Sequence, residues 1–275
     1  MPLDFEALKT TASGKRRSLL STVRNAKDID EETFKIKALL LGDSGGGKST
    51  GACTIPGKKL VLECDRRSES LAGTPDVQVV DIYTWEDAQA VVEELWTLAR
   101  SEEPFPYSAV IGDSLSSLSR MAMEWSMNLL DSKGKKTPTG LGGVPAQQHY
   151  FPQMHAVSQL ILAAIPLPCH VVFTGHLDIY EDKVLNTIDI YPKITGKVRT
   201  EVSSWFNETY LCVRKGGKYY WATAPFQRYT FLKSAMNKLG KYWQGDVELD
   251  FSQPPTGFEH LLDLRFRKEV APQKP

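Results

Sequence analysis

The strongest signal in the sequence is the segment Leu39-Leu40-Leu41-Gly42-Asp43-Ser44-Gly45-Gly46-Gly47-Lys48-Ser49-Thr50. It fits the pattern G-x-x-x-x-G-K-[ST], with Gly42, Gly47, Lys48 and Ser49 in the specified places. Glycines let the backbone turn tightly and point successive N–H groups at phosphate oxygens. In this pattern the lysine reaches the β- and γ-phosphates, and the serine hydroxyl ligates Mg²⁺. The segment therefore predicts a nucleoside triphosphate site with Mg²⁺, formed by residues 42–50.

The residues on either side of this segment fit the same interpretation. Residues 34–41 alternate and then run apolar, as expected of a strand that enters a buried parallel sheet. The loop would open a helix whose N-terminal end also favours an anion, and Pro56-Gly57 would end that helix within two turns. A glycine-rich turn that fits the pattern by chance is the alternative, and the preceding strand argues against it.

Composition limits the class of protein. A chain of 275 residues is long enough for one large α/β domain with a sizeable core. Its 33 basic and 33 acidic residues balance, so any site for a polyanion must be local. The four cysteines form no C-x-x-C pair, which argues against a zinc site and a disulfide scaffold. Neither a secretory segment nor a membrane-spanning run is found, so we expect a protein of the cytoplasm.

Two further predicted strands end in acids. Residues 59–65 read as a second buried strand that ends in Glu63 and Asp65. Acids at the carboxyl end of a parallel strand face the crevice in which α/β sheets bind ligands, so either one can activate the attacking water. A surface carboxylate is the alternative for each. Residues 107–114 form a hydrophobic strand that ends in Asp113, the pattern of a carboxylate that holds Mg²⁺ near Ser49.

A further buried strand, residues 169–176, ends in polar residues on the same side. Thr174 and His176 are candidates to sense the γ-phosphate, and a capped strand end with a surface histidine is the alternative.

Residues 77–82 are expected to form an edge strand. Thr84-Trp85-Glu86-Asp87 predicts a capping box that opens a helix, residues 115–129 and 153–165 predict two more helices, and residues 209–223 predict a hairpin that turns at Gly216-Gly217.

Two segments contain basic side chains and lack the regular spacing of apolar residues that is typical of a helix or a strand. Residues 132–143 are rich in glycine and lysine, and as a functional loop Lys133, Lys135 and Lys136 would suit the backbone of single-stranded DNA. The alternative is that this loop is merely disordered. Residues 177–201 are expected to be polar and irregular. Within them, Lys197 and Arg199 are candidates to deliver a charge to the phosphate of a neighbouring subunit, or they are simply solvated.

Taken together, these motifs resemble those of the RecA-like ATPases. More closely, the chain is similar to small core-only phage proteins of the AAA family that are related to single-strand-annealing recombinases. The resemblance covers about residues 34–224 and rests on GDSGGGKST, LVLECDRR, TWED, VIGDS, VVFTGH, PKITGKVRTEVSSWFNE and the glycine hairpin.

The resemblance implies an α/β fold of the RecA-like P-loop NTPase type, with a mostly parallel sheet flanked by helices and a C-terminal antiparallel hairpin extension. It implies an N-terminal extension at residues 1–33, an ATPase core at 34–225 and a C-terminal extension and tail at 226–275. It also implies ATP as the nucleotide, assembly into a homo-oligomer and DNA-facing loops at 132–148 and 177–199. If the protein is phage-encoded, the expected compartment is the cytoplasm of the host cell. The acid after the second strand would be the catalytic base, which is Asp65 with Glu63 beside it. The γ-phosphate sensor would be Thr174 or His176.

Three functions compete at this point. The first is an ATP-hydrolysing protein that acts on single-stranded DNA in phage recombination or replication. The second is a nucleotide-dependent switch or assembly factor with a protein partner and no DNA, and the third is an accessory subunit of a helicase or motor. A net charge of zero does not distinguish the first two functions, and the lysine-rich loop is the one feature of the sequence that favours DNA.

Overall fold

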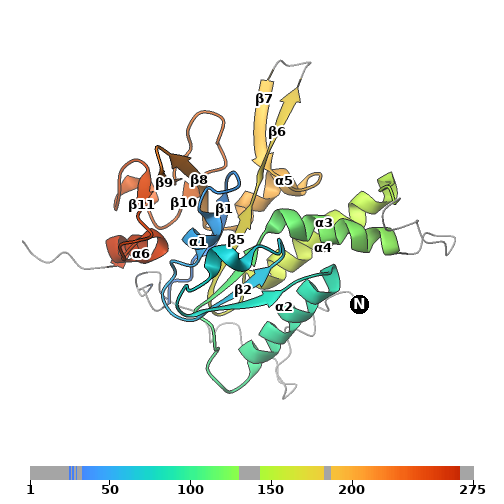
Figure 1. The fold of residues 1–275 in the computed structure, drawn as a ribbon, viewed down its shortest axis with the longest axis horizontal. Helices are drawn as coiled ribbons and strands as arrows, with labels where there is room; N and C mark the ends of the chain where they lie inside the picture. Colours follow the sequence, from blue (N-terminus) through green and yellow to red (C-terminus); the bar gives the residue numbers. More distant parts are fainter. Residues whose placement is uncertain are drawn as a thin grey trace, which may run out of the picture. The chain divides into compact units, whose positions relative to one another are not determined.

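The computed structural model describes residues 25, 27, 29, 33–129, 143–182 and 187–266. The chain divides into two compact units, Met1–Phe34 and Lys35–Pro275. The helices and strands labelled in Figure 1 belong to the second unit. Lys133, Lys135 and Lys136, with most of the predicted basic loop, lie outside the described residues.

The second unit is built on one sheet in the order β11-β9-β8-β1-β5-β4-β2-β3, with β10 also paired to β8. Pairing is parallel from β8 to β3 and antiparallel among β8, β9, β10 and β11. This confirms the predicted fold class, a mostly parallel sheet with a C-terminal antiparallel extension, and it places β3 at the expected edge. The strands are β1 (Lys37–Leu41), β2 (Lys59–Glu63), β3 (Val77–Asp81), β4 (Ala109–Asp113), β5 (His170–Gly175), β8 (Glu208–Lys215), β9 (Lys218–Ala222), β10 (Lys233–Ser234) and β11 (Val247–Leu249).

The central strands are buried from end to end, which explains their continuous apolar sequences. All residues of β2 and β4 are buried, and Leu39, Leu40 and Leu41 of β1 are fully buried. Strands covered by helices on both faces have no solvent-facing side and therefore show no polar alternation. The apolar core of the sheet thus lies directly beneath the loops that follow β1, β2, β4 and β5.

Helices flank the sheet (Figure 1), and α2, α3 and α4 pack against one another while α1 contacts α6. The predicted capping box is confirmed: the Thr84 hydroxyl accepts from the Asp87 amide at 3.1 Å, and the Asp87 carboxylate accepts from the Thr84 amide at 2.8 Å. The helices are α1 (Lys48–Ala52), α2 (Trp85–Arg100), α3 (Leu115–Asn128), α4 (Gln147–Ala164), α5 (Val198–Glu201) and α6 (Gly257–Phe266), with 3₁₀ turns η4 (Ser68–Leu71), η5 (Val202–Trp205) and η6 (Lys238–Gly240).

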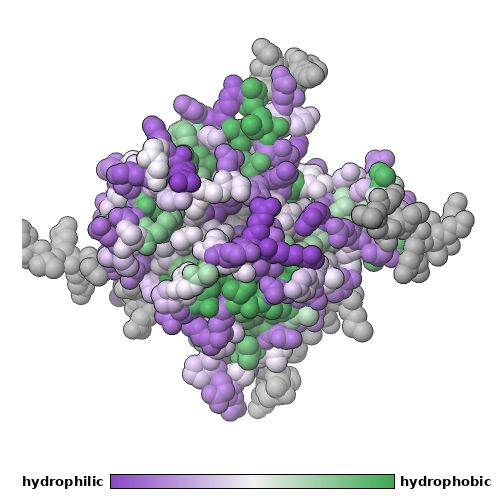
Figure 2. Space-filling model, in the orientation of Figure 1, coloured by the Kyte–Doolittle hydropathy of each residue, from purple (hydrophilic) through white to green (hydrophobic). Residues whose placement is uncertain are grey.

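One sequence expectation is wrong. Residues 177–201, expected to be irregular, contain an antiparallel hairpin of β6 (Leu177–Asp182) and β7 (Thr187–Pro192), followed by α5 (Figure 1). Ile179 pairs with Ile190, and apolar and polar side chains alternate in β7 but not throughout β6, where Glu181 falls on the same face as Ile179. The sequence of β6 therefore lacks a regular period of two, and the hairpin forms a separate two-stranded sheet. Its apolar side chains remain accessible, with Ile179 70% exposed, and they form an apolar surface over the hairpin in Figure 2.

In the part of the chain that the structure describes, no helix has both the length and the apolar character needed to cross a membrane.

Candidate nucleotide-binding site

A cavity of about 410 Å³ opens at the carboxyl ends of the parallel strands. Strand register produces this convergence: Glu63 at the end of β2 pairs with Asp113 at the end of β4, and the Gly42 amide donates to the Gly175 carbonyl at the end of β5. The lining residues come from the loop after β1 and the start of α1, from the carboxyl ends of β2 and β4, from the segment after β2 that includes η4, from the residue after β5, and from β9. They are Ser44, Gly45, Gly47, Lys48, Ser49, Thr50, Glu63, Asp65, Arg67, Glu69, Ser70, Asp113, His176 and Tyr219.

Two glycines of the loop have no room for a side chain. Gly47 has φ of 80°, and a Cβ atom there would come within 2.9 Å of the Tyr219 ring. A Cβ atom at Gly42 would lie 2.4 Å from the carbonyl oxygen of Cys212 on β8. The pattern of glycines therefore reflects both a left-handed backbone and close packing beneath the loop.

Lys48 is buried, with 7% of its surface exposed, and its ammonium donates to the carbonyls of Gly42 at 3.0 Å and Asp43 at 2.7 Å. These contacts hold the side chain across the loop, and the third N–H of the ammonium can serve a phosphate oxygen. Burial lowers the pKa of Lys48, while the nearby carboxylate of Asp113 acts in the opposite direction. Helix α1 has five residues, so anion binding depends more on Lys48 and the loop amides than on a helix dipole.

Ser49 and Asp113 line the same cavity and offer hydroxyl and carboxylate oxygens. Hard oxygen donors are what Mg²⁺ prefers, and this ion usually keeps several waters beside one or two protein ligands and the phosphates. The donor set therefore fits Mg²⁺. Asp113 is 6% exposed and accepts a short hydrogen bond from the Thr174 hydroxyl. Among the described residues, no group of three His, Cys, Asp or Glu side chains forms a separate metal site.

The two candidate acids after β2 have different surroundings. Glu63 is 2% exposed, and its carboxylate accepts from the backbone amides of Asp65 at 2.7 Å and Arg67 at 3.4 Å. Burial raises the pKa of Glu63, partly offset by those two amides. Asp65 is half-buried, lines the cavity and accepts from the Ser114 hydroxyl at 3.2 Å. Glu63 thus holds the loop that carries Asp65, and Asp65 keeps access to the cavity.

The two candidate sensors also differ. Thr174 is fully buried and its hydroxyl is used by Asp113, whereas His176 lines the cavity. The His176 amide donates to the Ser116 hydroxyl at 3.0 Å, which fixes the backbone at the start of α3 and β6. Burial, and then the charge of Lys48, lower the pKa of His176. Its imidazole is therefore uncharged at neutral pH.

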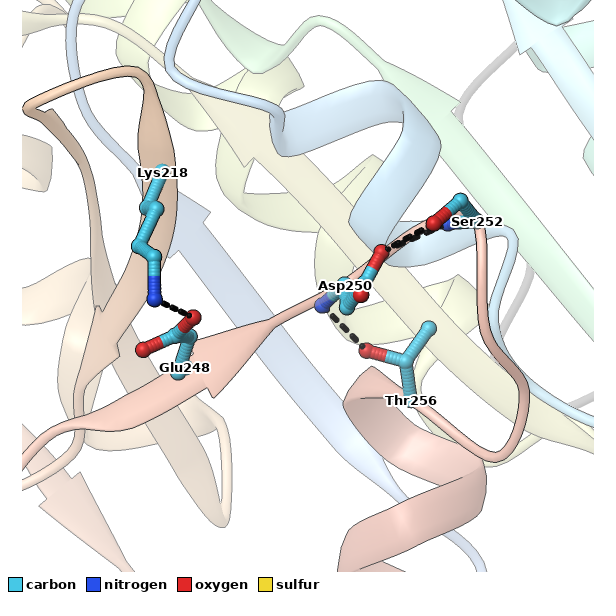
Figure 3. A network of polar contacts seen from close by, with 5 residues as sticks. All are labelled: Lys218, Glu248, Asp250, Ser252 and Thr256. Carbon is cyan, nitrogen blue, oxygen red and sulfur yellow. Dashed lines mark hydrogen bonds and ion pairs between the residues drawn. The ribbon is translucent and has the colours of Figure 1, made fainter.

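Four lining residues were not singled out from the sequence as site residues: Arg67, Glu69, Ser70 and Tyr219. The Tyr219 ring packs on Phe251 with 5.2 Å between centroids. The loop after β11 that carries Phe251 is held by polar contacts of Asp250 with Ser252 and Thr256, and an exposed ion pair of 2.6 Å joins Lys218 to Glu248 (Figure 3). A signal for Tyr219 exists in the sequence, since it lies two residues after the Gly216-Gly217 turn.

A second groove of about 470 Å³ lies on the other side of the phosphate-binding loop, against the β6–β7 hairpin. Gly42, Asp43 and Gly46, expected at the nucleotide, line this groove, and Ser44 and Gly45 line both hollows. Its remaining walls are Leu177, Ile179, Ile190, Leu211, Cys212, Val213, Arg214 and Tyr229.

Lys197 and Arg199 lie outside the lining of the nucleotide cavity. The Arg199 guanidinium lies over the rings of Tyr180 and Tyr191 on the hairpin, at 4.9 and 5.0 Å from their centroids. Lys197 is exposed. Whether either side chain reaches a neighbouring subunit stays a prediction.

Comparison with known proteins identifies the family of the chain. A model of the AAA_24 family, described as an AAA domain, matches residues 35–230. The matched region begins just before β1 and ends after β9, so it contains every strand that borders the cavity. Among curated proteins no match is found. Because the matched region covers well over half of the chain, the protein belongs to the AAA_24 family of P-loop AAA-type domains.

Proposed function

We propose that the protein is a Mg²⁺-dependent ATPase that acts on single-stranded DNA, in recombination or replication of a phage, as a homo-oligomer. One observation carries the ATPase part: Lys48, Ser49, Asp65 and Asp113, from three separate segments of the chain, line a single cavity. ATP as the nucleotide is favoured by the AAA family and by the resemblance to RecA-like enzymes.

In this proposal each side chain has a distinct role. Lys48 neutralises charge on the β- and γ-phosphates, while Ser49 and Asp113 would hold Mg²⁺, which neutralises further phosphate charge when bound. Asp65 orients the attacking water and accepts its proton. Glu63 positions Asp65 through the backbone contacts described above, because its own carboxylate is buried and already accepts two N–H groups.

The sensor role falls to His176, since it lines the cavity with an uncharged imidazole and begins the connection to the β6–β7 hairpin. Thr174 acts indirectly, because its hydroxyl donates a hydrogen bond to Asp113, the proposed Mg²⁺ ligand. Thr174 lies near the end of β5, the strand between β1 and β4, and His176 directly follows that strand. A change at the γ-phosphate can therefore reach both the metal acid and the hairpin through one strand.

The DNA part of the proposal is supported by the lysine-rich segment with Lys133, Lys135 and Lys136, and by the resemblance to phage recombinases. The hairpin, which falls in the second of the loops expected to face DNA, carries Asp178, Glu181 and Asp189. Acids repel a phosphate backbone, so the lysines, rather than the hairpin strands, are the proposed contacts. Assembly through Lys197 or Arg199 is part of the same proposal.

The test is ATP turnover and nucleotide binding by the wild type and by Lys48→Ala, with and without single-stranded DNA. We expect Lys48→Ala to weaken binding of a fluorescent ATP analogue greatly, because the ammonium opposes phosphate charge. Asp113→Ala should impair Mg²⁺-dependent turnover more than binding. Wild-type affinity in Lys48→Ala would remove the phosphate-binding assignment.

A second candidate function is a nucleotide-dependent switch or assembly factor that binds a protein and no DNA. The observation that favours it is the exposed apolar surface of the hairpin, where Ile179, Tyr180 and Ile188 are 70%, 47% and 41% exposed. Side chains of this kind more often meet protein than a phosphate backbone. Turnover that is unaffected by DNA, together with no DNA binding at low salt, would favour this alternative.

A further inference from the structure

We propose that Arg67 is a second cationic ligand of the triphosphate and a catalytic residue of the same chain's site. This inference rests on the proposed ATPase function and extends it, because Arg67 belongs to neither the phosphate-binding loop nor the strand ends. Arg67 lies on the loop after β2 and lines the cavity together with Lys48, Ser49 and Asp113.

The loop has a conformation that separates two consecutive arginines. Glu63 accepts from the amides of Asp65 and Arg67, which winds the backbone around its carboxylate. Arg66 adopts φ of 56°, in the left-handed region that few residues other than glycine occupy. Its guanidinium lies over the Tyr83 ring, at 5.0 Å from the centroid, whereas Arg67 lines the cavity. Such backbone outliers are concentrated at functional sites, where the surroundings hold them in place.

The Arg67 side chain is exposed, and no described residue forms an ion pair, a hydrogen bond or a ring contact with it. Three other arginines do not line this cavity and lie over aromatic rings: Arg66 over Tyr83, Arg199 over Tyr180 and Tyr191, and Arg214 over Tyr219 at 5.3 Å from the centroid. A guanidinium is permanently charged and presents paired donors that match phosphate oxygens. Arg67 is therefore the arginine that this site offers to an anion.

The charges around the cavity give a reason for a second cation. Four carboxylates line it, those of Glu63, Asp65, Glu69 and Asp113. Lys48 is the other cation among the lining residues, and the lowered pKa of His176 keeps that imidazole uncharged. A bound triphosphate adds several negative charges in the same space. Lys48 alone would leave much of the negative charge of the carboxylates and the triphosphate without a compensating cation. Arg67 lines the same cavity and can neutralise part of that charge.

The proposed reaction is hydrolysis of the bond between the β–γ bridging oxygen and the γ-phosphorus. The oxygen of a water forms a bond to the γ-phosphorus while the bond from that phosphorus to the β–γ bridging oxygen breaks. ADP leaves with the electron pair, the water proton passes to Asp65, and inorganic phosphate is the second product. Negative charge spreads over the equatorial γ-oxygens and grows on the bridging oxygen in the transition state, and a guanidinium at these oxygens stabilises it.

The variants to compare are Arg67→Ala and Arg67→Lys, with Arg66→Ala as the matched control. The control removes an adjacent arginine that packs on Tyr83 and does not line the cavity. We expect Arg67→Ala to lower kcat by about 10²-fold or more, as removal of one preorganised electrostatic group typically does. Arg67→Lys should recover part of the rate, and Arg66→Ala should stay close to the wild type.

A binding measurement gives a second readout that needs no turnover. Affinities for ADP and for a non-hydrolysable ATP analogue should differ less in Arg67→Ala than in the wild type, because the guanidinium that is removed binds the γ-phosphate. The Arg67 proposal is overturned if Arg67→Ala and Arg66→Ala match the wild type in both measurements while Lys48→Ala abolishes binding. If wild type and Lys48→Ala bind ATP equally, the proposed function itself fails, and the Arg67 role fails with it.

Mixing subunits tests whether the arginine serves its own site. Arg67→Ala protein is mixed with Asp65→Asn protein, and turnover is compared with the sum of the separate activities. We expect no increase, since each mutant site lacks a group that the same chain must supply. Turnover above that sum would show that Arg67 acts on a neighbouring subunit and would overturn the same-chain assignment.

Discussion

The Thr174 hydroxyl donates a hydrogen bond to the Asp113 carboxylate, linking the carboxyl ends of two adjacent parallel strands, β5 and β4. Both side chains are buried, so the contact is shielded from water. It fixes the orientation of the acid that, in the proposed function, holds Mg²⁺ opposite Ser49. Thr174 does not line the cavity, but its hydrogen bond orients Asp113, the proposed Mg²⁺ ligand.

Thr174→Val should separate this contact from simple packing. Valine has a similar shape but leaves the buried carboxylate without its donor, and hydrogen bonds to charged groups are worth about 1.5–3 kcal/mol. We expect a decrease of that size in the free energy of unfolding and a higher Mg²⁺ concentration for half-maximal turnover. Thr174→Ser keeps the hydroxyl and is the control. Equal Mg²⁺ dependence in the two variants would contradict the positioning role.

Asp65→Asn and Glu63→Gln should have unequal effects. We expect Asp65→Asn to bind ATP but to decrease turnover by about 10²–10⁴-fold, the usual contribution of a general base. Glu63→Gln should keep most activity, since an amide oxygen can still accept from the backbone amides of Asp65 and Arg67. Single-turnover hydrolysis measures both. If Glu63→Gln alone abolishes hydrolysis, the two acids have exchanged roles.

Much of the site could be predicted because its residues belong to local patterns. Lys48 and Ser49 are fixed by the glycine spacing, and Asp113 and Asp65 by apolar strands that end in acids. Parallel strands bring such ends to one edge of the sheet, which is why residues far apart in sequence meet there. The residues alone left the roles of Glu63 and Asp65 open, and only the resemblance favoured Asp65, because the backbone amides that donate to Glu63 are brought to it by the folded loop.

Arg67, one of the lining residues that were missed, depends on backbone geometry without a sequence signature. The direction of Arg67 follows from the left-handed conformation of Arg66, where a glycine would have given a signal. The β6–β7 hairpin was hidden for another reason. Its acids interrupt the apolar positions without a regular period of two, because Asp178 and Glu181 fall on opposite faces of β6, and the apolar side chains Ile179 and Ile188 are exposed.

Glu208 should make the stability depend on pH. Its side chain is fully buried and accepts from Tyr210 at 2.6 Å, Ser234 at 2.5 Å and the Met236 amide at 3.0 Å, and burial raises its pKa above the ordinary value of 4.5. A raised pKa means that the fold favours the protonated form. The contribution of Glu208 to the free energy of unfolding is thus fully present below the unfolded pKa and is lost as pH rises through the folded pKa.

Glu208→Gln should therefore flatten the dependence of unfolding free energy on pH, because an amide does not titrate. Urea unfolding from about pH 4 to about pH 8 measures it. Glu94→Gln, on the exposed face of α2, is the control and should leave the dependence as in the wild type. A slope in Glu208→Gln equal to that of the control would show that Glu208 does not contribute.

The DNA prediction concerns Lys133, Lys135 and Lys136, which lie outside the described residues. Neutralising all three to alanine should weaken single-stranded DNA binding and flatten its salt dependence. On a single strand, each lysine–phosphate contact accounts for about 0.7 in the slope of log K against log salt, so removing three lowers the slope by about 2. Affinity for ATP should hardly change, because these lysines are no part of the phosphate-binding pattern, and binding should be indifferent to base sequence.

Fluorescence anisotropy of a labelled oligonucleotide over a salt series measures this, with a non-hydrolysable ATP analogue present. A second triple variant, Lys215→Ala with Lys238→Ala and Lys241→Ala, removes the same charge from exposed positions elsewhere and is the control. If the two triple variants bind single-stranded DNA equally weakly, the net charge of the protein, and not the lysine-rich loop, determines the affinity for DNA. If the wild type binds no DNA even at low salt, the recombinase proposal fails. In that case the exposed apolar side chains of the β6–β7 hairpin favour the second candidate function, a nucleotide-dependent switch that binds a protein partner.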